Sequence, residues 1–337
     1  MRKKILFSAF LLIAIAVVYR LSVFTPELAS FSGPTMGTTY TVKFFTKKDV
    51  NNSSDLKYDV DAALVRVNKL MSTYDPNSEL SLFNKLPKGQ SAVVSKDMAY
   101  VIDKALLISE MSDGEYDVTI GPLVNLWGFG PGKREDKVPS QDAIEEARLR
   151  VGYHYLKLDN LHLTKEKDIY VDLSSIAKGY GVDVVARVLE DKGIESYLVE
   201  VGGEIASKGI KPDGSPWKIA IESPAGGHDI AERIIDVKDV AVATSGDYRN
   251  YFEKNGVRYS HTISPVTGRP ITHRLVSVTV VDKTTTMADG LATAITVLGP
   301  EKGFEFAQKN GIAAYLLVKT DFGFEEHPSD AFRSYLK

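Results

Sequence analysis

The sequence predicts an α+β fold preceded by an N-terminal hydrophobic helix, and two observations favour this fold class. Several segments place apolar residues at the spacing of an amphipathic helix, while others are short alternating runs that follow one another closely enough to form hairpins. These helices and strands are mixed without the strict alternation that is typical of a parallel sheet. The 337 residues contain no internal repeat or low-complexity segment, and they suffice for one large domain or two closely packed ones.

The N-terminal half is predicted to contain one strand and three helices. The strand covers residues 39–45, where Thr, Tyr, Val and Phe alternate with one another along the chain. Each helix carries apolar side chains three or four residues apart, which places them on one face. The three helices cover residues 59–70, 96–111 and 140–151.

The C-terminal half is richer in strands. A strand over residues 168–173 is expected to run directly into a helix over 175–192, which Gly193 ends. The next strand, 197–201, closes on the pair Gly202-Gly203. The remaining predicted strands cover 217–222, 231–236, 240–244, 275–281 and 313–319, and the remaining helices cover 288–298 and 300–309.

The first 24 residues form a basic, hydrophobic leader. They contain Arg2, Lys3, Lys4 and Arg20, no acidic residue, and an apolar stretch that reaches roughly 20 residues, near the minimum for a membrane span. A cleaved signal peptide and an N-terminal anchor both fit. Residues 26–32 contain no clean small-x-small cleavage site, which favours the anchor. We therefore expect a leader over 1–24, a linker over 25–32 and one domain over 33–337.

The charge of the leader also predicts where the domain lies. Positive charge on its N-terminal side places the domain across the membrane from the cytoplasm. In a bacterium this is the periplasmic face of the inner membrane, or the periplasm if the leader is cleaved. The absence of Cys is compatible with that compartment and excludes disulfides and a lipidated Cys.

Composition and motifs exclude several classes of function. Without the four basic residues of the leader, 37 Lys and Arg face 44 Asp and Glu, a formal charge of −7 that argues against nucleic-acid binding. Six scattered His and no Cys make a dedicated zinc site improbable. The glycine-rich run over 128–133 lacks the spacing of a phosphate-binding P-loop, and no nucleophile elbow or His-Glu-x-x-His motif is present.

One pair of residues near the C-terminus has the spacing of metal ligands. Asp289 and Thr293 are four residues apart in a segment of small and apolar residues. If this segment is helical, both side chains share one face and present hard oxygen ligands suited to Mg²⁺ or Ca²⁺. On spacing alone the pair is more typical of a helix N-cap followed by a surface hydroxyl one turn later.

Six segments, taken together and in order, carry a resemblance to a known family. They read GPTMGT (33–38), MSTYDPNSEL (71–80), DGEYDVTIGPL (113–123), VDLSSIAKGYGVD (171–183), HTISPVTG (261–268) and ADGLAT (288–293). At these points the chain resembles the ApbE family of FAD:protein FMN transferases. The resemblance extends from Gly33 to the C-terminus, and it implies an ApbE-like, T-fold-related arrangement of mixed sheets and helices.

The resemblance also implies a reaction. In this family the FMN half of FAD is transferred through its phosphate to a Thr hydroxyl of an exported or membrane-bound redox protein, and AMP is released. Attack on phosphorus within a pyrophosphate is favoured by a divalent cation that neutralises the leaving charge. Two alternatives remain open: an FAD pyrophosphatase that uses water in place of Thr, and a noncatalytic FAD-binding protein of the periplasm.

The cation and its ligands follow from the same resemblance. Asp289 and Thr293 match the side-chain ligands of the family, and the backbone carbonyl near Ser175 would complete the protein's share of an octahedral Mg²⁺ site, with Ca²⁺ as the alternative ion. Asp289 thereby has a catalytic role as well. His261 is the candidate for proton transfer, because imidazole titrates near neutrality, although a structural His is an equal alternative.

The remaining matched residues are predicted to bind FAD. From the residues alone, Met36 and Tyr74 are also typical of core packing, Asp172 of a helix N-cap, and Lys178 of a solvated charge in a first helical turn. The predicted FAD contacts are Met36, Tyr74, Glu115, Tyr116, Asp117, Asp172, Lys178 and Ile263.

Overall fold

A computed structural model describes residues 26–46, 53–132, 138–222, 231–246, 251–254 and 257–336. The predicted leader over residues 1–24 lies outside this part of the chain. Within the described ranges, no helix has the length and apolar character needed to cross a membrane.

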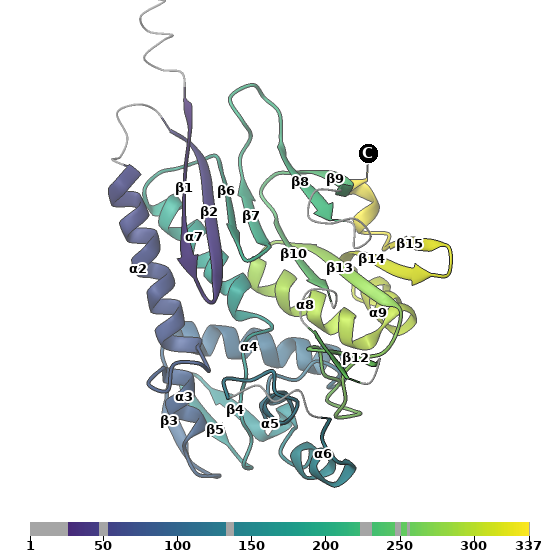
Figure 1. The fold of residues 1–337 in the computed structure, drawn as a ribbon. Coiled ribbons are helices and arrows are strands. Elements are labelled where there is room, and N and C mark those ends of the chain that lie inside the picture. The colour runs from purple at the N-terminus through teal and green to yellow at the C-terminus, as the bar shows by residue number, and fades with distance from the viewer. Residues whose placement is uncertain are drawn as a thin grey trace, which may run out of the picture.

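An eight-stranded antiparallel sheet is the centre of the fold (Figure 1). Its order is β1-β2-β6-β7-β10-β13-β14-β15. Residues 27–32, which we expected to be a linker, belong to β1 and pair with β2. The strands are β1 Glu27–Thr35, β2 Thr38–Thr46, β6 Tyr197–Val201, β7 Glu204–Lys208, β10 Ala241–Gly246, β13 Leu275–Asp282, β14 Ala313–Thr320 and β15 Gly323–Pro328.

The two faces of this sheet bury different layers, because side chains alternate along each strand. In β14, Ala314 and Leu316 join the core beneath the helices, whereas Tyr315 and Leu317 join a separate core on the opposite face. That second core is completed by a hairpin of β8 (Trp217–Glu222) and β9 (Ala231–Val237) and by the short helix η3 (Phe332–Tyr335).

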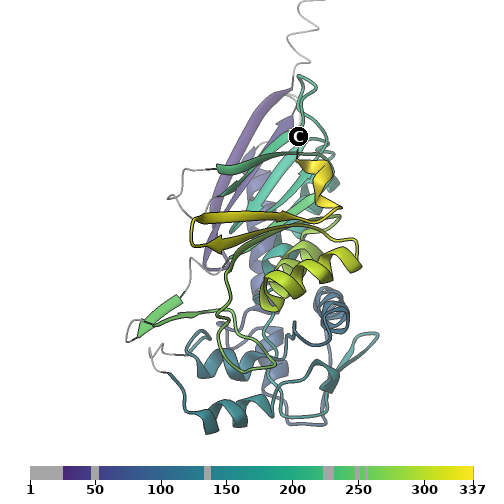
Figure 2. The same ribbon diagram turned by 90° about the vertical axis from the view of Figure 1, so that its right-hand side faces the viewer.

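Helices form the other layer, as the side view shows (Figure 2). Their apolar stripes meet the sheet and one another in two contiguous clusters of buried residues. The helices are α2 Ser53–Met71, α4 Lys96–Met111, α7 Ala177–Asp191, α8 Thr285–Leu298 and α9 Pro300–Lys309. The predicted helices over 59–70, 96–111 and 300–309 are confirmed, and the first begins six residues earlier and ends one residue later than predicted.

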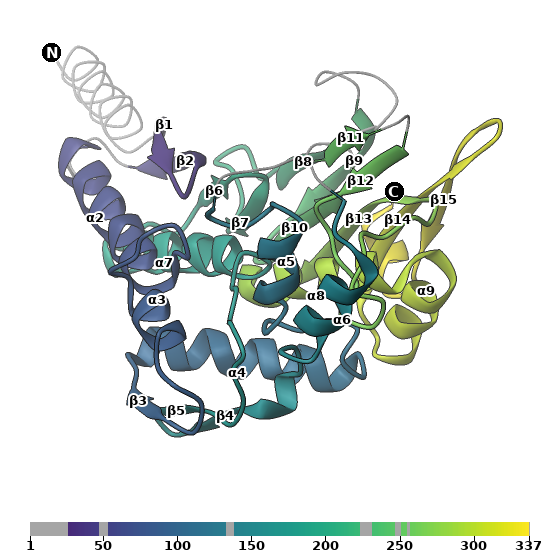
Figure 3. The same ribbon diagram turned by 60° about the horizontal axis from the view of Figure 1, so that its bottom comes forward.

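Smaller elements complete the fold: β3, β4 and β5 lie beyond α4, whereas the β11–β12 hairpin lies away from α4 (Figure 3). A three-stranded sheet in the order β3-β5-β4 and several short helices support the loops that approach the large sheet from this side. The elements are α3 Glu79–Asn84, β3 Ser91–Val93, α5 Gly121–Leu126, α6 Gln141–Arg148, η1 Tyr153–Tyr155, β4 Leu156–Asp159, β5 His162–Lys165, β11 Tyr251–Lys254 and β12 Val257–Ser260.

One predicted strand is absent, and two predicted helix starts are wrong. Residues 168–173 do not form a strand; they are irregular apart from one isolated bridge between Tyr170 and Ile120. The helix that follows begins at Ala177, so Ser175 precedes it. Helix α8 begins at Thr285, with Thr284 as its N-cap, so that Asp289 lies inside the helix and is not a cap.

Candidate active site

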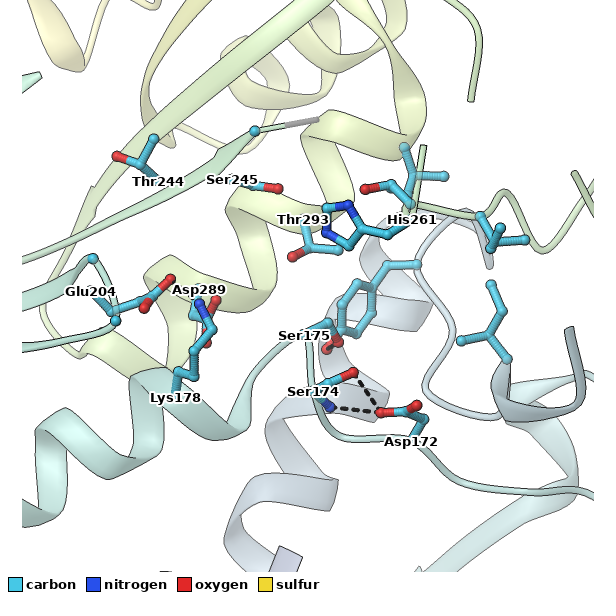
Figure 4. A pocket seen from close by; sticks show the side chains of 18 of the residues that line it. Asp172, Ser174, Ser175, Lys178, Glu204, Thr244, Ser245, His261, Asp289 and Thr293 are labelled. Carbon is cyan, nitrogen blue, oxygen red and sulfur yellow. Dashed lines mark hydrogen bonds and ion pairs between the residues drawn. The ribbon is translucent and has the colours of Figure 1, made fainter. Parts of the chain in front are cut away.

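A cavity of about 650 Å³ lies between the helical layer, the ends of β6, β7 and β10, and the loops of the smaller part of the fold. Its volume lies within the range of pockets that hold small-molecule ligands. Every predicted site residue except Met36 lines it. Figure 4 shows Asp289, Thr293, Ser175, Lys178 and His261 around one space, although they come from three distant parts of the chain.

Helix α8 places Asp289 and Thr293 one turn apart, both in the cavity wall. The Asp289 side chain is almost fully buried, and its Oδ2 accepts a hydrogen bond from the Gly179 backbone N–H at 2.9 Å. A side chain at position 179 has no room, because a Cβ there would lie 2.3 Å from the Thr285 carbonyl oxygen and 2.8 Å from Asp289 Cβ. Because Gly179 has no side chain, α7 and α8 can pack closely. The Gly179 N–H then lies close enough to hold the Asp289 carboxylate in place.

A second contact between these helices sets where α8 begins. Asp183 of α7 accepts hydrogen bonds from the backbone N–H groups of Thr285 at 2.8 Å and Thr286 at 2.9 Å, and from the Thr286 hydroxyl at 2.5 Å. The first N–H groups of a helix have no partner within the helix, so this carboxylate completes the N-terminus of α8.

We predict that Asp183→Ala lowers the free energy of unfolding by about 1–2 kcal/mol, as loss of a capping carboxylate does elsewhere. Chemical denaturation of the metal-free protein measures this change. Asp183→Asn retains an acceptor oxygen and should fall between the wild type and the Ala variant. An Ala variant as stable as the wild type would contradict the assigned capping role.

Two buried carboxylates share one ammonium group at the helical end of the cavity. Lys178 Nζ donates to Glu204 Oε1 at 2.5 Å, and Glu204 and Asp289 are 2% and 6% exposed. Burial raises the pKa of both carboxyl groups. Asp289 raises the pKa of Glu204 further, and the Lys178 ammonium lowers both pKa values in part. The cluster therefore carries more negative than positive charge when both carboxyls are ionised, which is an environment that a divalent cation stabilises.

The donor set fits such a cation. A carboxylate from Asp289 and a hydroxyl from Thr293 are the hard oxygen ligands that Mg²⁺ prefers. Within the described residues no group of three or more His, Cys, Asp or Glu is placed to hold a metal. The protein therefore offers part of a coordination shell and leaves positions for a ligand's oxygens and water, as is typical of Mg²⁺ bound with phosphates.

The segment before α7 is held by side chains. Asp172 Oδ1 accepts from the Ser174 backbone N–H at 2.8 Å and from its hydroxyl at 2.6 Å, so Asp172 closes a local turn and is not a helix N-cap. Asn84 pairs its side-chain amide with both backbone groups of Val171, each at 2.8 Å. These hydrogen bonds from Asn84 and Asp172 hold the Asp172 carboxylate and Ser175 at the cavity, although no strand supports the segment.

Tyr116 and Asp117 form the floor on the opposite side. The buried Tyr116 hydroxyl accepts a hydrogen bond from Ser175 Oγ at 2.9 Å, and burial raises the pKa of this phenol so that it stays neutral. Asp117 accepts from Thr119 through one oxygen and from the Tyr153 backbone N–H through the other, both at 2.7 Å. Burial raises the pKa of the Asp117 carboxyl. Its hydrogen bonds to Thr119 and Tyr153 hold this loop in place.

Aromatic groups gather at the outer end. Tyr74 is 67% exposed, so the alternative that it packs in the core is wrong. Its hydroxyl donates to the Phe129 carbonyl at 3.4 Å, and the Phe129 ring meets His261 edge-on at 6.4 Å between centroids. Ile263 lies buried beside them in the cavity wall. This end therefore offers exposed ring faces to a flat heterocycle.

Met36 is the predicted residue that the structure does not place in the cavity wall. It lies in the turn between β1 and β2 with a positive φ of 49°, and it packs against both helical core clusters. A contact between Met36 and FAD stays a prediction. Glu204, conversely, lines the cavity and is not among the predicted site residues. Its sequence signal is a charged residue directly after Gly202-Gly203, at the start of the next strand.

A cavity with oxygen ligands and an ammonium group at one end and aromatic rings at the other is suited to a ligand that joins phosphate to an aromatic ring, as in an enzyme that acts on a nucleotide. Comparison with models of known protein families identifies the family to which this chain belongs. Residues 36–316 match the model of the ApbE family, and the chain belongs to this family. It is an enzyme, a transferase acting in flavin transfer.

Curated relatives and solved structures support the same family assignment. The chain is 49% identical over 311 residues to a FAD:protein FMN transferase of Vibrio cholerae, covering 92% of this chain and 93% of that protein. A FAD:protein FMN transferase of Escherichia coli is 39% identical, covering 92% and 90%. The flavin transferase ApbE structure from Vibrio cholerae superposes with a TM-score of 0.86 at 47% identity, covering 92% of this chain and 99% of that one.

Proposed function

We propose that this protein transfers the FMN moiety of FAD to a Thr hydroxyl of a target redox protein in a Mg²⁺-dependent reaction that releases AMP. The observation that carries the proposal is the joint placement of Asp289, Thr293 and the Lys178 ammonium in one cavity wall, facing the aromatic end. The relatives' names support FAD as the flavin donor and a protein as the acceptor.

The reaction forms one bond and breaks one. The acceptor hydroxyl oxygen attacks the phosphorus of the FMN half, the bond from this phosphorus to the AMP oxygen breaks, and AMP leaves with the electron pair. A bound Mg²⁺ would neutralise charge on the pyrophosphate oxygens. Asp289, Thr293 and the carbonyl of Ser175 would hold it, Lys178 would pair with a phosphate oxygen, and His261 would take the hydroxyl proton.

The leader pattern supports a location for this activity. A basic segment followed by an apolar one favours an anchor in a bacterial inner membrane, with the enzyme on the periplasmic face, or a periplasmic enzyme if the leader is cleaved. Its targets would then be exported or membrane-bound redox proteins.

The test combines the purified protein with FAD, Mg²⁺ and a candidate acceptor domain. Flavin fluorescence that stays with the denatured acceptor, with one AMP released per flavin attached, is the expected result. It should disappear with EDTA or when the acceptor Thr is replaced by Val. Free FMN and AMP with an unlabelled acceptor would instead identify a pyrophosphatase, and FAD binding without AMP would identify a noncatalytic binder.

A further inference from the structure

Glu204 has a position that its role in the fold does not explain. It is the first residue of β7, directly after the tight Gly202-Gly203 turn that joins β6 to β7. Strand positions at this depth normally hold apolar side chains, yet this carboxylate is 2% exposed and lines the cavity. Figure 4 shows it pointing towards Asp289 and Lys178.

The two oxygens of the Glu204 carboxylate have different hydrogen-bond environments. Oε1 accepts from Lys178 Nζ at 2.5 Å. Oε2 is buried and has no hydrogen-bond partner among the described residues. An unsatisfied buried carboxylate oxygen destabilises the folded protein, and such groups in native proteins are commonly satisfied by a bound ligand or water. Oε2 therefore lacks a hydrogen-bond donor that a ligand in this cavity would supply.

If FAD is the substrate, as the proposed function states, its chemistry limits which of its groups can donate a hydrogen bond to Glu204 Oε2. Phosphate oxygens accept hydrogen bonds and do not donate them at neutral pH. The donors nearest the pyrophosphate are the hydroxyls of the ribityl chain and of the ribose. Because Lys178 and Asp289 lie beside Glu204, a pyrophosphate held there brings one of these hydroxyls within reach of Oε2.

We propose that Glu204 is a further substrate-binding residue of the transfer reaction. Its Oε2 accepts a hydrogen bond from a ribityl or ribose hydroxyl of bound FAD, and its Oε1 keeps the Lys178 ammonium at the pyrophosphate. The unsatisfied oxygen in the free protein is then a loss of stability retained for binding, as is common at functional sites.

The experiment compares Glu204→Gln with wild type in binding FAD, FMN and ADP, all in EDTA so that no cation contributes. Gln keeps the shape and removes the charge, and loss of a charge-assisted hydrogen bond should weaken FAD binding by about tenfold to a hundredfold. If Glu204→Gln also weakens the binding of FMN but not of ADP, the hydrogen-bond donor is a ribityl hydroxyl. If it weakens the binding of ADP but not of FMN, the donor is a ribose hydroxyl.

Two controls separate a binding role from a structural one. Glu190→Gln removes a carboxylate that pairs with Lys208 at 2.7 Å outside the cavity, and it should leave FAD binding unchanged. Thermal denaturation of Glu204→Gln should show a melting temperature close to that of the wild type, because the Gln amide oxygen can still accept from Lys178 and the neighbouring Asp289 carboxylate still offsets its charge. Should this variant be unfolded, Glu204→Asp, which withdraws the carboxylate while keeping its charge, takes its place and should also weaken FAD binding.

Three results would overturn the proposal. They are wild-type FAD affinity in Glu204→Gln, a defect that appears only when Mg²⁺ is present, and a loss of stability without a change in binding. The second would mark Glu204 as a cation ligand instead. Failure of the wild type itself to bind FAD would reject the proposed function, which is a different outcome from a wild type that binds and a variant that binds equally well.

Discussion

Replacing Asp289 with Ala is expected to lower Mg²⁺-dependent turnover by about a thousandfold or more, while FAD binding becomes weaker but remains measurable. A loss of this size corresponds to about 4 kcal/mol of transition-state stabilisation, as expected when a charged ligand of a catalytic cation is removed. Binding persists because most of the cavity wall, including its aromatic end, is unchanged. AMP release at saturating FAD and Mg²⁺ measures the first effect, and titration of FAD in EDTA the second.

Two further variants show whether the loss is due to the cation. Asp289→Asn keeps an acceptor for the Gly179 N–H, which Ala leaves unsatisfied, and should be as inactive while better folded. Thr293→Val should reduce turnover less than either, because a neutral hydroxyl contributes less to a cation than a carboxylate does. Near-normal Mg²⁺-dependent turnover in Asp289→Ala would show that the metal site is assigned wrongly.

The order of elements was largely predictable because local periodicity determines it. The strand predicted over 197–201 is β6, and the helix predicted over 96–111 is α4, each with the predicted bounds. Residues 168–173 have the composition of a strand, but their backbone groups find partners in the Asn84 side chain and the Val118 carbonyl. A strand needs a neighbouring strand, and sequence periodicity does not show which neighbour the fold supplies.

The start of α8 was missed for a similar reason. Three consecutive Thr residues, 284–286, are poor helix formers, so the predicted helix began after them. The Asp183 carboxylate, about a hundred residues earlier in the chain, stabilises the N–H groups of Thr285 and Thr286. Glu204 was missed because a charged residue in a short strand is usually solvated, and only the packing of β7 against the helical layer buries it.

Gly179→Ala is expected to destabilise the protein, although Ala is normally favoured over Gly inside a helix by up to about 1 kcal/mol. The sign reverses because the new methyl group would lie 2.3 Å from the Thr285 carbonyl oxygen and 2.8 Å from Asp289 Cβ. Neither neighbour is the end of a flexible side chain, so α7 and α8 must separate. Overpacking of this kind costs typically about 1–3 kcal/mol. Denaturant unfolding of the metal-free protein measures the change.

The same variant should lose activity out of proportion to its stability. Separating the helices lengthens the bond from Gly179 N–H to Asp289 Oδ2 and moves the carboxylate, and a displacement of about 1 Å at a catalytic group costs on the order of a hundredfold in rate. Gly181→Ala, on the same helix, is the matched control. Its methyl group would meet Met36 Sδ at 3.1 Å and Leu64 Cδ2 at 3.5 Å, both at the ends of side chains that yield easily. This control should be neutral or slightly stabilising and fully active, so equal effects at 179 and 181 would contradict the close approach of α7 and α8 as the feature that positions Asp289.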